Sequence, residues 1–143
     1  MDINSLSTRA EQSDLEIQAV LRAEIRDLQF RHEVEIALLH ATYALILNGP
    51  AEGLPTLAEQ TRLTLDSVLF DTDWYLETYS DVAQSGMVPA EHYVRAGAFE
   101  GRDPGPKFAT MAYYFANPDV AEAGWPALVH YVHSGKTEGR PLA

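Results

Sequence analysis

Apolar positions recur at helical spacing through the first third of the chain. From residue 13 to residue 48 there is no Gly or Pro, and apolar residues return every three or four positions, which places them on one face of a helix. Ser13 and Glu16 form a capping-box pattern at its start. The run stops at "NGP", where Asn or Gly accepts left-handed backbone and Pro cannot continue a helix. We therefore predict a long helix over residues 13–48, preceded by a flexible arm over residues 1–12.

The two halves of this helix differ in polarity. The first half is charged and carries a short apolar stripe, formed by Leu21, Ile25 and Leu28, whereas the second half is mostly apolar. The stripe favours association of copies into a bundle or coiled coil, although His32 and Glu35 interrupt it. Alternatively, only the apolar second half packs on the following domain while the charged half projects. Both interpretations are open at this point, and we expect a homo-oligomer or a larger protein assembly.

A second, shorter helix is predicted after the loop "AEGLP". Thr56 and Glu59 give another capping-box pattern, and the helix is expected to reach Leu69. Its apolar residues should face a core. These residues are Leu57, Leu65, Val68 and Leu69.

The last half of the chain consists of two related copies. Residues 70–102 align with residues 108–140 at a constant offset of 38 without a gap, and 14 of the 33 paired positions are identical. Self-similarity at such a period indicates a repeated supersecondary unit. We predict a helical domain over residues 54–143, with repeats at 70–107 and 108–143 and the short preceding helix as a cap.

Each copy has the pattern of two short helices joined by a turn. The first helix is expected to end at Gly86 or Gly124 and the second at Gly97 or Gly135, because Gly is the usual residue at a helix C-terminus. No segment has the pattern of a sheet. The predicted fold class is therefore all-α, with a long N-terminal helix followed by a small domain of two helix-turn-helix repeats.

Three polar residues recur in both copies at one spacing. They are His92, Glu100 and Arg102 in the first copy and His130, Glu138 and Arg140 in the second. They could form a polar site, or they could serve local structure, with Arg paired to Glu or capping a carbonyl and His bonded to backbone. The structural interpretation is favoured, because one small domain seldom needs the same catalytic site twice.

Aromatic residues that differ between the copies are better candidates for recognition. Trp74, Tyr79 and Trp125 stand opposite Ala112, Asn117 and Met87. Aromatic faces with polar neighbours suit sugar rings or the energetic centre of a protein interface. These three residues are our candidate ligand contacts.

Composition and charge narrow the classes of partner. The net charge is −11, which argues against nucleic acid and against an anionic membrane surface, because both are bound through clustered Lys and Arg. The apolar run at 36–47 is shorter than the roughly 20 residues that span a bilayer, so no membrane insertion is expected. No classical signal-peptide pattern is visible, and we expect a product made in the cytoplasm that can enter a released particle or assembly.

Candidate chemistry is sparse. The chain has no Cys, which excludes disulfides and thiol catalysis, and it contains no nucleophile elbow, phosphate loop or dinucleotide fingerprint. His130 and His133 lie three apart, but no third metal ligand accompanies them. The acidic run around Asp71, Asp73 and Asp81 lacks the Gly and Glu of a calcium loop. The sequence therefore predicts no catalytic residues, no metal and no cofactor.

The repeat resembles a known bacterial sequence. The segment "FDTDWYLETYSDVAQSGMVPAEHYVRAGAFEGRDPGPKF" is similar to a short repeat of the form "FD..YYL..NPDVA..G..PL.HY...G..EGR.P". That repeat occurs in surface-polysaccharide-associated proteins, including rhamnan-synthesis-type glycosyltransferases and hemolysin-type secreted proteins. "TYSDVA" departs from the pattern in the first copy, and the second copy lacks the initial Asp. The resemblance covers about half of the chain and implies an association with polysaccharide but no catalytic role.

A second resemblance concerns architecture only. An acidic chain without Cys, with a long helix and a sugar-associated domain, resembles head-spike subunits of phage-like gene transfer agents. Together these features predict a non-enzymatic, oligomeric structural or attachment subunit whose repeat domain presents a recognition surface, with polysaccharide as the ligand that the resemblance implies. The alternative is a protein–protein adaptor in a bacterial envelope-polysaccharide assembly. A glycan-processing enzyme is the third possibility.

Overall fold

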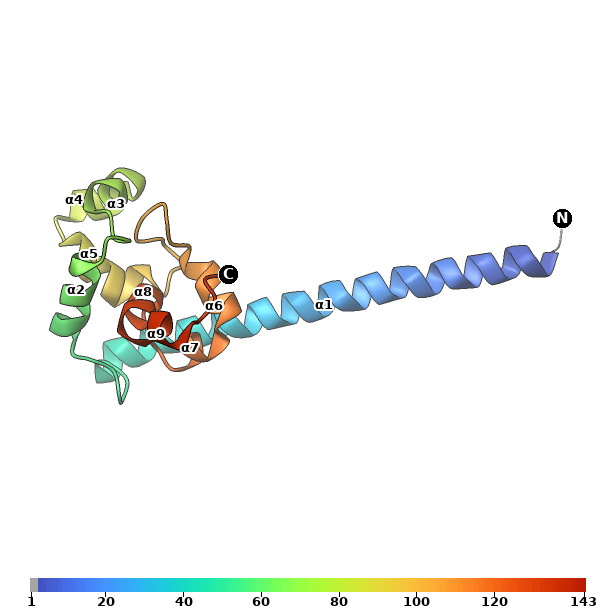
Figure 1. Cartoon of the computed structure of the whole chain (residues 1–143), viewed down its shortest axis with the longest axis horizontal. Helices are drawn as coiled ribbons and strands as arrows, with labels where there is room; N and C mark the ends of the chain where they lie inside the picture. Colours follow the sequence, from blue (N-terminus) through green and yellow to red (C-terminus); the bar gives the residue numbers. More distant parts are fainter. Residues whose placement is uncertain (1–2) are drawn as a thin grey trace. The chain divides into compact units, whose positions relative to one another are not determined.

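The structure is a computed structural model and describes residues 3–143. Over these residues the chain is helical, with a long N-terminal helix followed by a smaller helical region (Figure 1). The described residues form no strand; they contain one isolated bridge, between Gly105 and Phe108. The prediction of an all-α fold is confirmed.

Helix α1 (Ile3–Asn48) is longer than predicted. The expected flexible arm is wrong for residues 3–12, which are helical, and residues 1–2 lie outside the described part of the chain. The physical reason is that residues 3–12 contain no Gly or Pro, and each residue added to an existing helix gains one hydrogen bond. Ser13 and Glu16 therefore lie within the helix and do not form its start. The other end is as expected, because α1 stops at Asn48 and Gly49 adopts a left-handed φ of 74°.

The chain divides into two compact units, Met1–Glu33 and Val34–Ala143. The second unit thus begins within α1 rather than at residue 54. Val34 and Leu38 are buried in the core of this unit, with exposed fractions of 4% and 3%. One side of the apolar second half thus packs in the second unit, as one of the two interpretations of the sequence expected. The remaining apolar residues of this half, such as Leu39 and Tyr43, stay exposed.

Helix α2 (Leu57–Asp66) packs against elements of both repeats, as expected of a cap. Thr56 is its N-cap and accepts a hydrogen bond from the Glu59 amide. The predicted core face is wrong for Leu65 and Val68, which are 52% and 95% exposed. Leu65 follows the buried Thr64 by one residue and therefore lies on another side of the helix. The helix ends at Asp66, so Val68 does not continue its buried face.

Polar residues take the buried positions of α2 instead. They are Gln60 and Thr64, whose side chains donate hydrogen bonds to the carbonyls of Pro55 and Gln60. Because these bonds satisfy the buried groups, polar side chains are tolerated where an apolar face was expected.

Each repeat contains more helical segments than the two that were predicted. The first contains α3 (Thr72–Thr78), α4 (Ser80–Ser85), α5 (Pro89–His92) and the π-helical turn η1 (Tyr93–Gly97). The second contains α6 (Thr110–Ala116), α7 (Pro118–Glu122), α8 (Ala127–His130), the π-helical turn η2 (Tyr131–Gly135) and α9 (Lys136–Glu138). The first predicted helix breaks in both copies, because Tyr79 and Asn117 leave helical backbone with φ of −114° and −135°.

Gly97 and Gly135 are the last residues of η1 and η2, as expected, but they do not act as left-handed helix stops, because Ala98 and Lys136 continue in helical backbone. The left-handed residues that follow are Gly101 and Gly139, with φ of 82° and 71°. The helical chain therefore ends at the Glu-Gly-Arg sequence. There the amide of Arg102 donates to the carbonyl of Gly97 at 2.9 Å, and the second copy makes the same bond.

Close packing explains why Gly is present at these two positions. A Cβ atom on Gly97 would collide with the hydroxyl of Tyr75, and one on Gly135 would collide with the hydroxyl of Tyr113. Both tyrosines are fully buried. The glycines therefore provide space for a buried tyrosine rather than a left-handed turn.

We expect Gly97→Ala to destabilise the protein by roughly 1–3 kcal/mol, because the added methyl group overpacks the contact with the Tyr75 hydroxyl. In a Tyr75→Phe background, which lacks that hydroxyl, the same substitution should cost much less. Denaturant unfolding of the four chains measures this coupling. An equal cost in both backgrounds would show that the hydroxyl does not set the constraint.

Candidate functional site

The recurring arginine lies at the centre of a charged cluster in each repeat. Arg102 makes two hydrogen bonds to Asp81, at 2.8 and 2.7 Å, and its Nε lies 2.8 Å from Glu100. In the second copy, Arg140 makes a single hydrogen bond to Asp119 and another contact to Glu138, both at 2.8 Å. The Arg–Glu contact was among the sequence interpretations.

The Asp partner was missed, although its signal was present in the sequence. Asp81 and Asp119 are an identical pair of the repeat, and each lies 21 residues before its arginine. Hydrogen bonding to Arg102 lowers the pKa of the Asp81 carboxyl to about 2, and Arg140 lowers the pKa of Asp119 in the same direction. Each arginine joins the first helical stretch of its repeat to the closing turn.

The recurring histidines bond to tyrosine side chains, not to backbone as expected. Nδ1 of His92 lies 2.7 Å from the hydroxyl of Tyr75, and Nδ1 of His130 lies 2.8 Å from the hydroxyl of Tyr113. The reason is the glycine one turn later, which leaves room for a tyrosine hydroxyl beside each imidazole. Burial lowers the pKa of both histidines, which favours their neutral form.

These two clusters show the features of structural interactions. Each charged group of the clusters is paired within its own repeat, and Nδ1 of each histidine is bonded to a tyrosine hydroxyl. Across residues 3–143, no group of three His, Asp or Glu side chains could hold a metal ion. His133 is not paired with His130 as a ligand, and its Nδ1 lies 2.6 Å from the hydroxyl of Ser134.

Tyr79, one of the three candidate ligand contacts, has a structural role. Its hydroxyl accepts a hydrogen bond from the amide of Asp103 at 2.8 Å, and the Arg102 guanidinium lies 4.9 Å above its ring. In the second repeat, Asn117 donates to the carbonyl of Pro141 at 2.8 Å. Tyr79 and Asn117 occupy the same position of the two repeats, and each bonds to the residue that follows the arginine of its repeat. The alignment of the two copies could not reveal this shared role, because the two side chains differ.

The two tryptophans are partly buried and lie in separate repeats. Trp74 meets Tyr79 edge to face, with ring centroids 6.1 Å apart. Trp125 lies against His130 and His133, with centroids 5.4 and 5.1 Å away. Within the described part of the chain, no ring contact joins these two groups. The structure therefore brings together Trp74 and Tyr79 but leaves Trp125 as a second, independent aromatic position.

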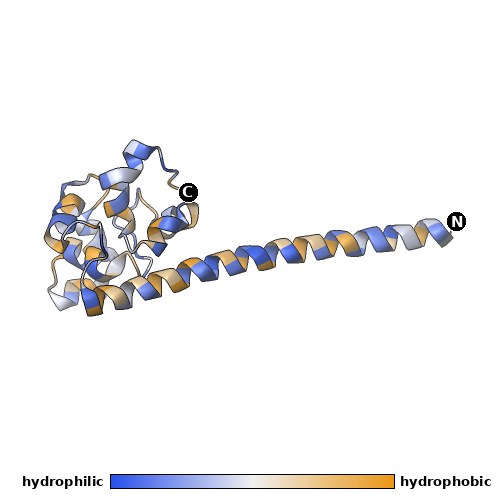
Figure 2. Ribbon diagram, turned by 90° about the horizontal axis from the view of Figure 1, so that it is seen from below, coloured by the Kyte–Doolittle hydropathy of each residue, from blue (hydrophilic) through white to orange (hydrophobic). Residues whose placement is uncertain are grey.

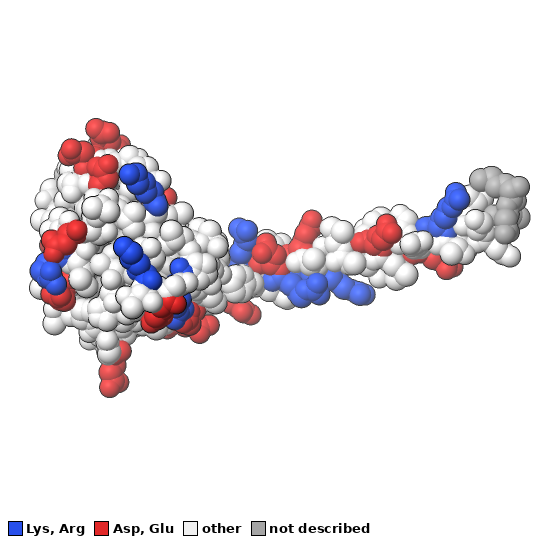
Figure 3. All heavy atoms as spheres, in the orientation of Figure 1, with Lys and Arg blue, Asp and Glu red and all other residues white. Residues whose placement is uncertain are grey.

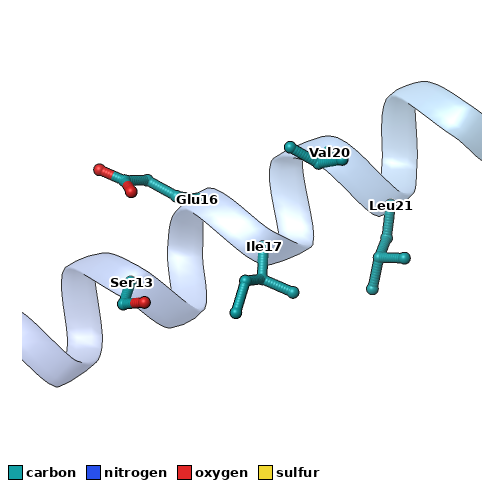
Figure 4. A pocket seen from close by; sticks show the side chains of 5 residues that line it. All are labelled: Ser13, Glu16, Ile17, Val20 and Leu21. Atoms are coloured by element: carbon teal, nitrogen blue, oxygen red, sulfur yellow. The ribbon is translucent and has the colours of Figure 1, made fainter.

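The first unit exposes a set of large apolar side chains along α1. Leu21, Ile25 and Leu28, the predicted oligomerisation stripe, are 50%, 52% and 65% exposed. Ile17 and Leu21 extend to the same side of the helix, whereas Glu16 extends away from it, and a shallow hollow lies beside them (Figure 4). Apolar residues alternate with polar residues along the helix (Figure 2), and charges of both signs are interspersed among them (Figure 3).

This apolar surface does not make α1 a membrane span. None of the helices in residues 3–143 combines the length and apolar character needed to cross a bilayer. Comparisons with protein-family models, with curated proteins and with solved structures find no match to this chain. The function proposed below is therefore inferred from the residues of the chain and the geometry of their side chains.

His130, which is buried, and His92, which is partly buried, predict a dependence of stability on pH. Their folded pKa lies below the unfolded value, so the unfolded chain binds protons more readily and stability falls as the pH drops below about 6.5. Each imidazole contributes a slope of at most about 1.4 kcal/mol per pH unit. Urea unfolding between pH 7 and pH 5 should show this loss, and the double variant His92→Asn, His130→Asn should show a smaller one. An unchanged slope in the variant would contradict the assignment.

Proposed function

We propose that the chain is a non-enzymatic, oligomeric structural or attachment subunit, which self-associates through α1 and presents the repeat domain as a recognition surface. This proposal rests on the exposed apolar stripe of the first unit, which consists of Leu21, Ile25 and Leu28. Burying each half-exposed aliphatic side chain contributes about 1 kcal/mol, so several of them in both partners supply a substantial driving force. The polar clusters of the repeats support a scaffold rather than a catalyst, since their groups are paired with one another.

Polysaccharide is the ligand that we favour for the repeat domain. The support is the resemblance of the repeat to sequences of surface-polysaccharide-associated proteins, together with two partly buried tryptophans that have polar neighbours. Trp74 has Asp71 and Asp73 close by in the chain, and Trp125 has His133 against its ring. An aromatic face beside hydrogen-bonding groups suits a sugar ring. A head spike of a phage-like particle is one assembly in which such a subunit would serve.

Self-association is tested by replacing the stripe. We expect the chain to have a mass that is a multiple of 15.9 kDa in light scattering, and the variant Leu21→Gln, Ile25→Gln, Leu28→Gln to approach the mass of one chain. The control variant Ala19→Gln, Ala23→Gln changes exposed residues on the opposite side of the helix and should keep the wild-type mass. A monomeric wild-type chain at all concentrations would refute self-association.

Sugar recognition is tested on an array of bacterial polysaccharides with the full chain. We expect binding that falls by about tenfold or more in Trp74→Ala or Trp125→Ala, which corresponds to the loss of one aromatic–sugar contact. Tyr43→Ala, which removes an exposed aromatic ring from α1, is the matched control. Failure of the folded wild-type chain to bind any polysaccharide would favour the adaptor function instead.

A further inference from the structure

A hollow of about 450 Å³ lies in the second unit where three helical elements meet. The second half of α1, the first residue of α2 and the region of η1 contribute its walls. This volume is within the range of roughly 300–1,000 Å³ that is usual for ligand sites. We call it the central hollow. Its lining contains the apolar residues Leu45, Ile46 and Leu57 and the polar residues Thr42, Arg95 and Glu100.

The polar side chains of the central hollow retain hydrogen-bonding groups for a ligand. Nε of Arg95 donates to Glu91 at 2.9 Å, and within residues 3–143 its two terminal nitrogens make no hydrogen bond. One carboxylate oxygen of Glu100 lies 2.8 Å from Nε of Arg102, whereas its other oxygen has no hydrogen bond to the described residues. The hydroxyl of Thr42 donates to a backbone carbonyl, so its oxygen can still accept. The hollow therefore offers both donors and acceptors beside apolar side chains.

Two further hollows adjoin the central one. A hollow of about 360 Å³ shares Leu57 and Arg95 with it, and a hollow of about 410 Å³ shares Glu100. All three lie within the second unit. On α1 alone, the residues that line them run from Glu35 to Ile46, which is about 16 Å at 1.5 Å per residue. We call the three hollows together the cleft, and a ligand that fills it must be extended.

The charges of the cleft favour a ligand without net charge. Glu91 and Glu100 are paired with Arg95 and Arg102, so Glu35 is the one lining carboxylate without an ion pair in the described residues. An anionic ligand would also meet the charge of the second unit, which contains 14 Asp and Glu residues but six Lys and Arg residues. A cationic ligand would meet the guanidinium of Arg95. An uncharged ligand avoids both conflicts.

Sugar hydroxyls meet these requirements better than a peptide does. Each hydroxyl both donates and accepts, so hydroxyls of one sugar unit can accept from Arg95 and donate to Thr42 and Glu100. The C–H groups of the same unit can contact the apolar side chains. An extended peptide finds no strand edge here, because the surrounding elements are helical and use their own backbone groups. The apolar anchors of a helical peptide would meet Arg95 in the central hollow.

We propose that the cleft binds an internal segment of an uncharged polysaccharide, with one sugar unit in the central hollow and its neighbours in the adjoining hollows. This inference rests on the proposed recognition of polysaccharide and adds the charge of the ligand, its extended form and a place where it binds. Trp74 and Trp125 do not line any of the three hollows, so the cleft is a contact region separate from the tryptophans.

Filling the central hollow tests its role. Ala96 lines this hollow, whereas Ser134, at the same position of the second repeat and also partly buried, lines none of the three. We expect Ala96→Phe to weaken the binding of neutral polysaccharide at least tenfold and Ser134→Phe to change it less than twofold. The measurement is affinity electrophoresis of the full chain in gels that contain dextran, mannan, amylose or a neutral bacterial capsular polysaccharide. Circular dichroism checks that both variants fold.

Removing a donor tests the chemistry of the same hollow without filling it. Arg95 and Arg62 are both exposed arginines in ion pairs along a helix, but Arg62 does not line the cleft. We expect Arg95→Ala to weaken binding to the same gels about tenfold, because the sugar loses hydrogen bonds from a charged donor. Arg62→Ala, the matched control, should bind as the wild-type chain does.

Ligand length and charge test the remaining parts of the inference. Oligosaccharides of one, three and six units, prepared from the neutral polysaccharide that binds best, should compete with it in order of length. We expect at least a tenfold gain in affinity from one unit to three, because three units reach all three hollows. Alginate and hyaluronan, which carry a carboxylate in their repeating units, should bind more weakly than the neutral polymers in the same gels.

The outcomes separate this inference from the proposed function. Weaker binding in both cleft variants, with both controls unchanged, supports the cleft. Folded cleft variants that bind polysaccharide as the wild-type chain does would overturn the inference, as expected if the cleft holds a peptide instead, while sugar recognition would stand. Preference for the acidic polymers would overturn the uncharged ligand, and equal affinity for one and three units would overturn the extended one. A wild-type chain that binds no polysaccharide would refute the proposed sugar recognition and this inference together.

Discussion

The contact of a buried tyrosine hydroxyl with a histidine and a glycine determines how each repeat packs. In the first repeat, the Tyr75 hydroxyl bonds to Nδ1 of His92 and occupies the space that a Cβ on Gly97 would fill. A buried hydroxyl without a partner would cost free energy, so the imidazole and the missing side chain are both required. This contact joins the first helical stretch of the repeat to its π-helical turn. The second repeat makes the same contact with Tyr113, which explains why the two copies fold alike.

The charged clusters reinforce this arrangement from the solvent side. Arg102 is 23% exposed and holds Asp81 and Glu100, so it links the beginning of the repeat to its closing turn. Exposed ion pairs usually contribute little, but two hydrogen bonds from one guanidinium to one carboxylate give a defined geometry. In this domain, the polar groups that first suggested a site therefore serve the scaffold. The recognition that we propose therefore rests chiefly on side chains outside these clusters, such as the tryptophans and the exposed face of α1.

The two faces of α1 connect this scaffold to the proposed assembly. Val34 and Leu38 complete the core of the second unit, and Leu39 and Tyr43 remain exposed on the same helix. A helix that is apolar on more than one side has more apolar surface than one small domain can bury. Self-association is the physical consequence that we propose, because it removes this surface from water without an additional protein.

The sequence alone determined the helical class, the end of α1 and the 38-residue repeat, because these depend on local rules: helix-breaking residues, capping patterns and identical spacing. It did not reveal that residues 3–12 are helical, since a polar segment without Gly or Pro is compatible with both helix and coil. Only the tertiary structure decided the roles of Gly97, Tyr79 and Asp81. Asp81 and Tyr79 act through partners that lie 21 and 24 residues away in the chain. Gly97 acts by leaving space for the hydroxyl of Tyr75. Such pairings follow from the packing of the repeat, which no local pattern specifies.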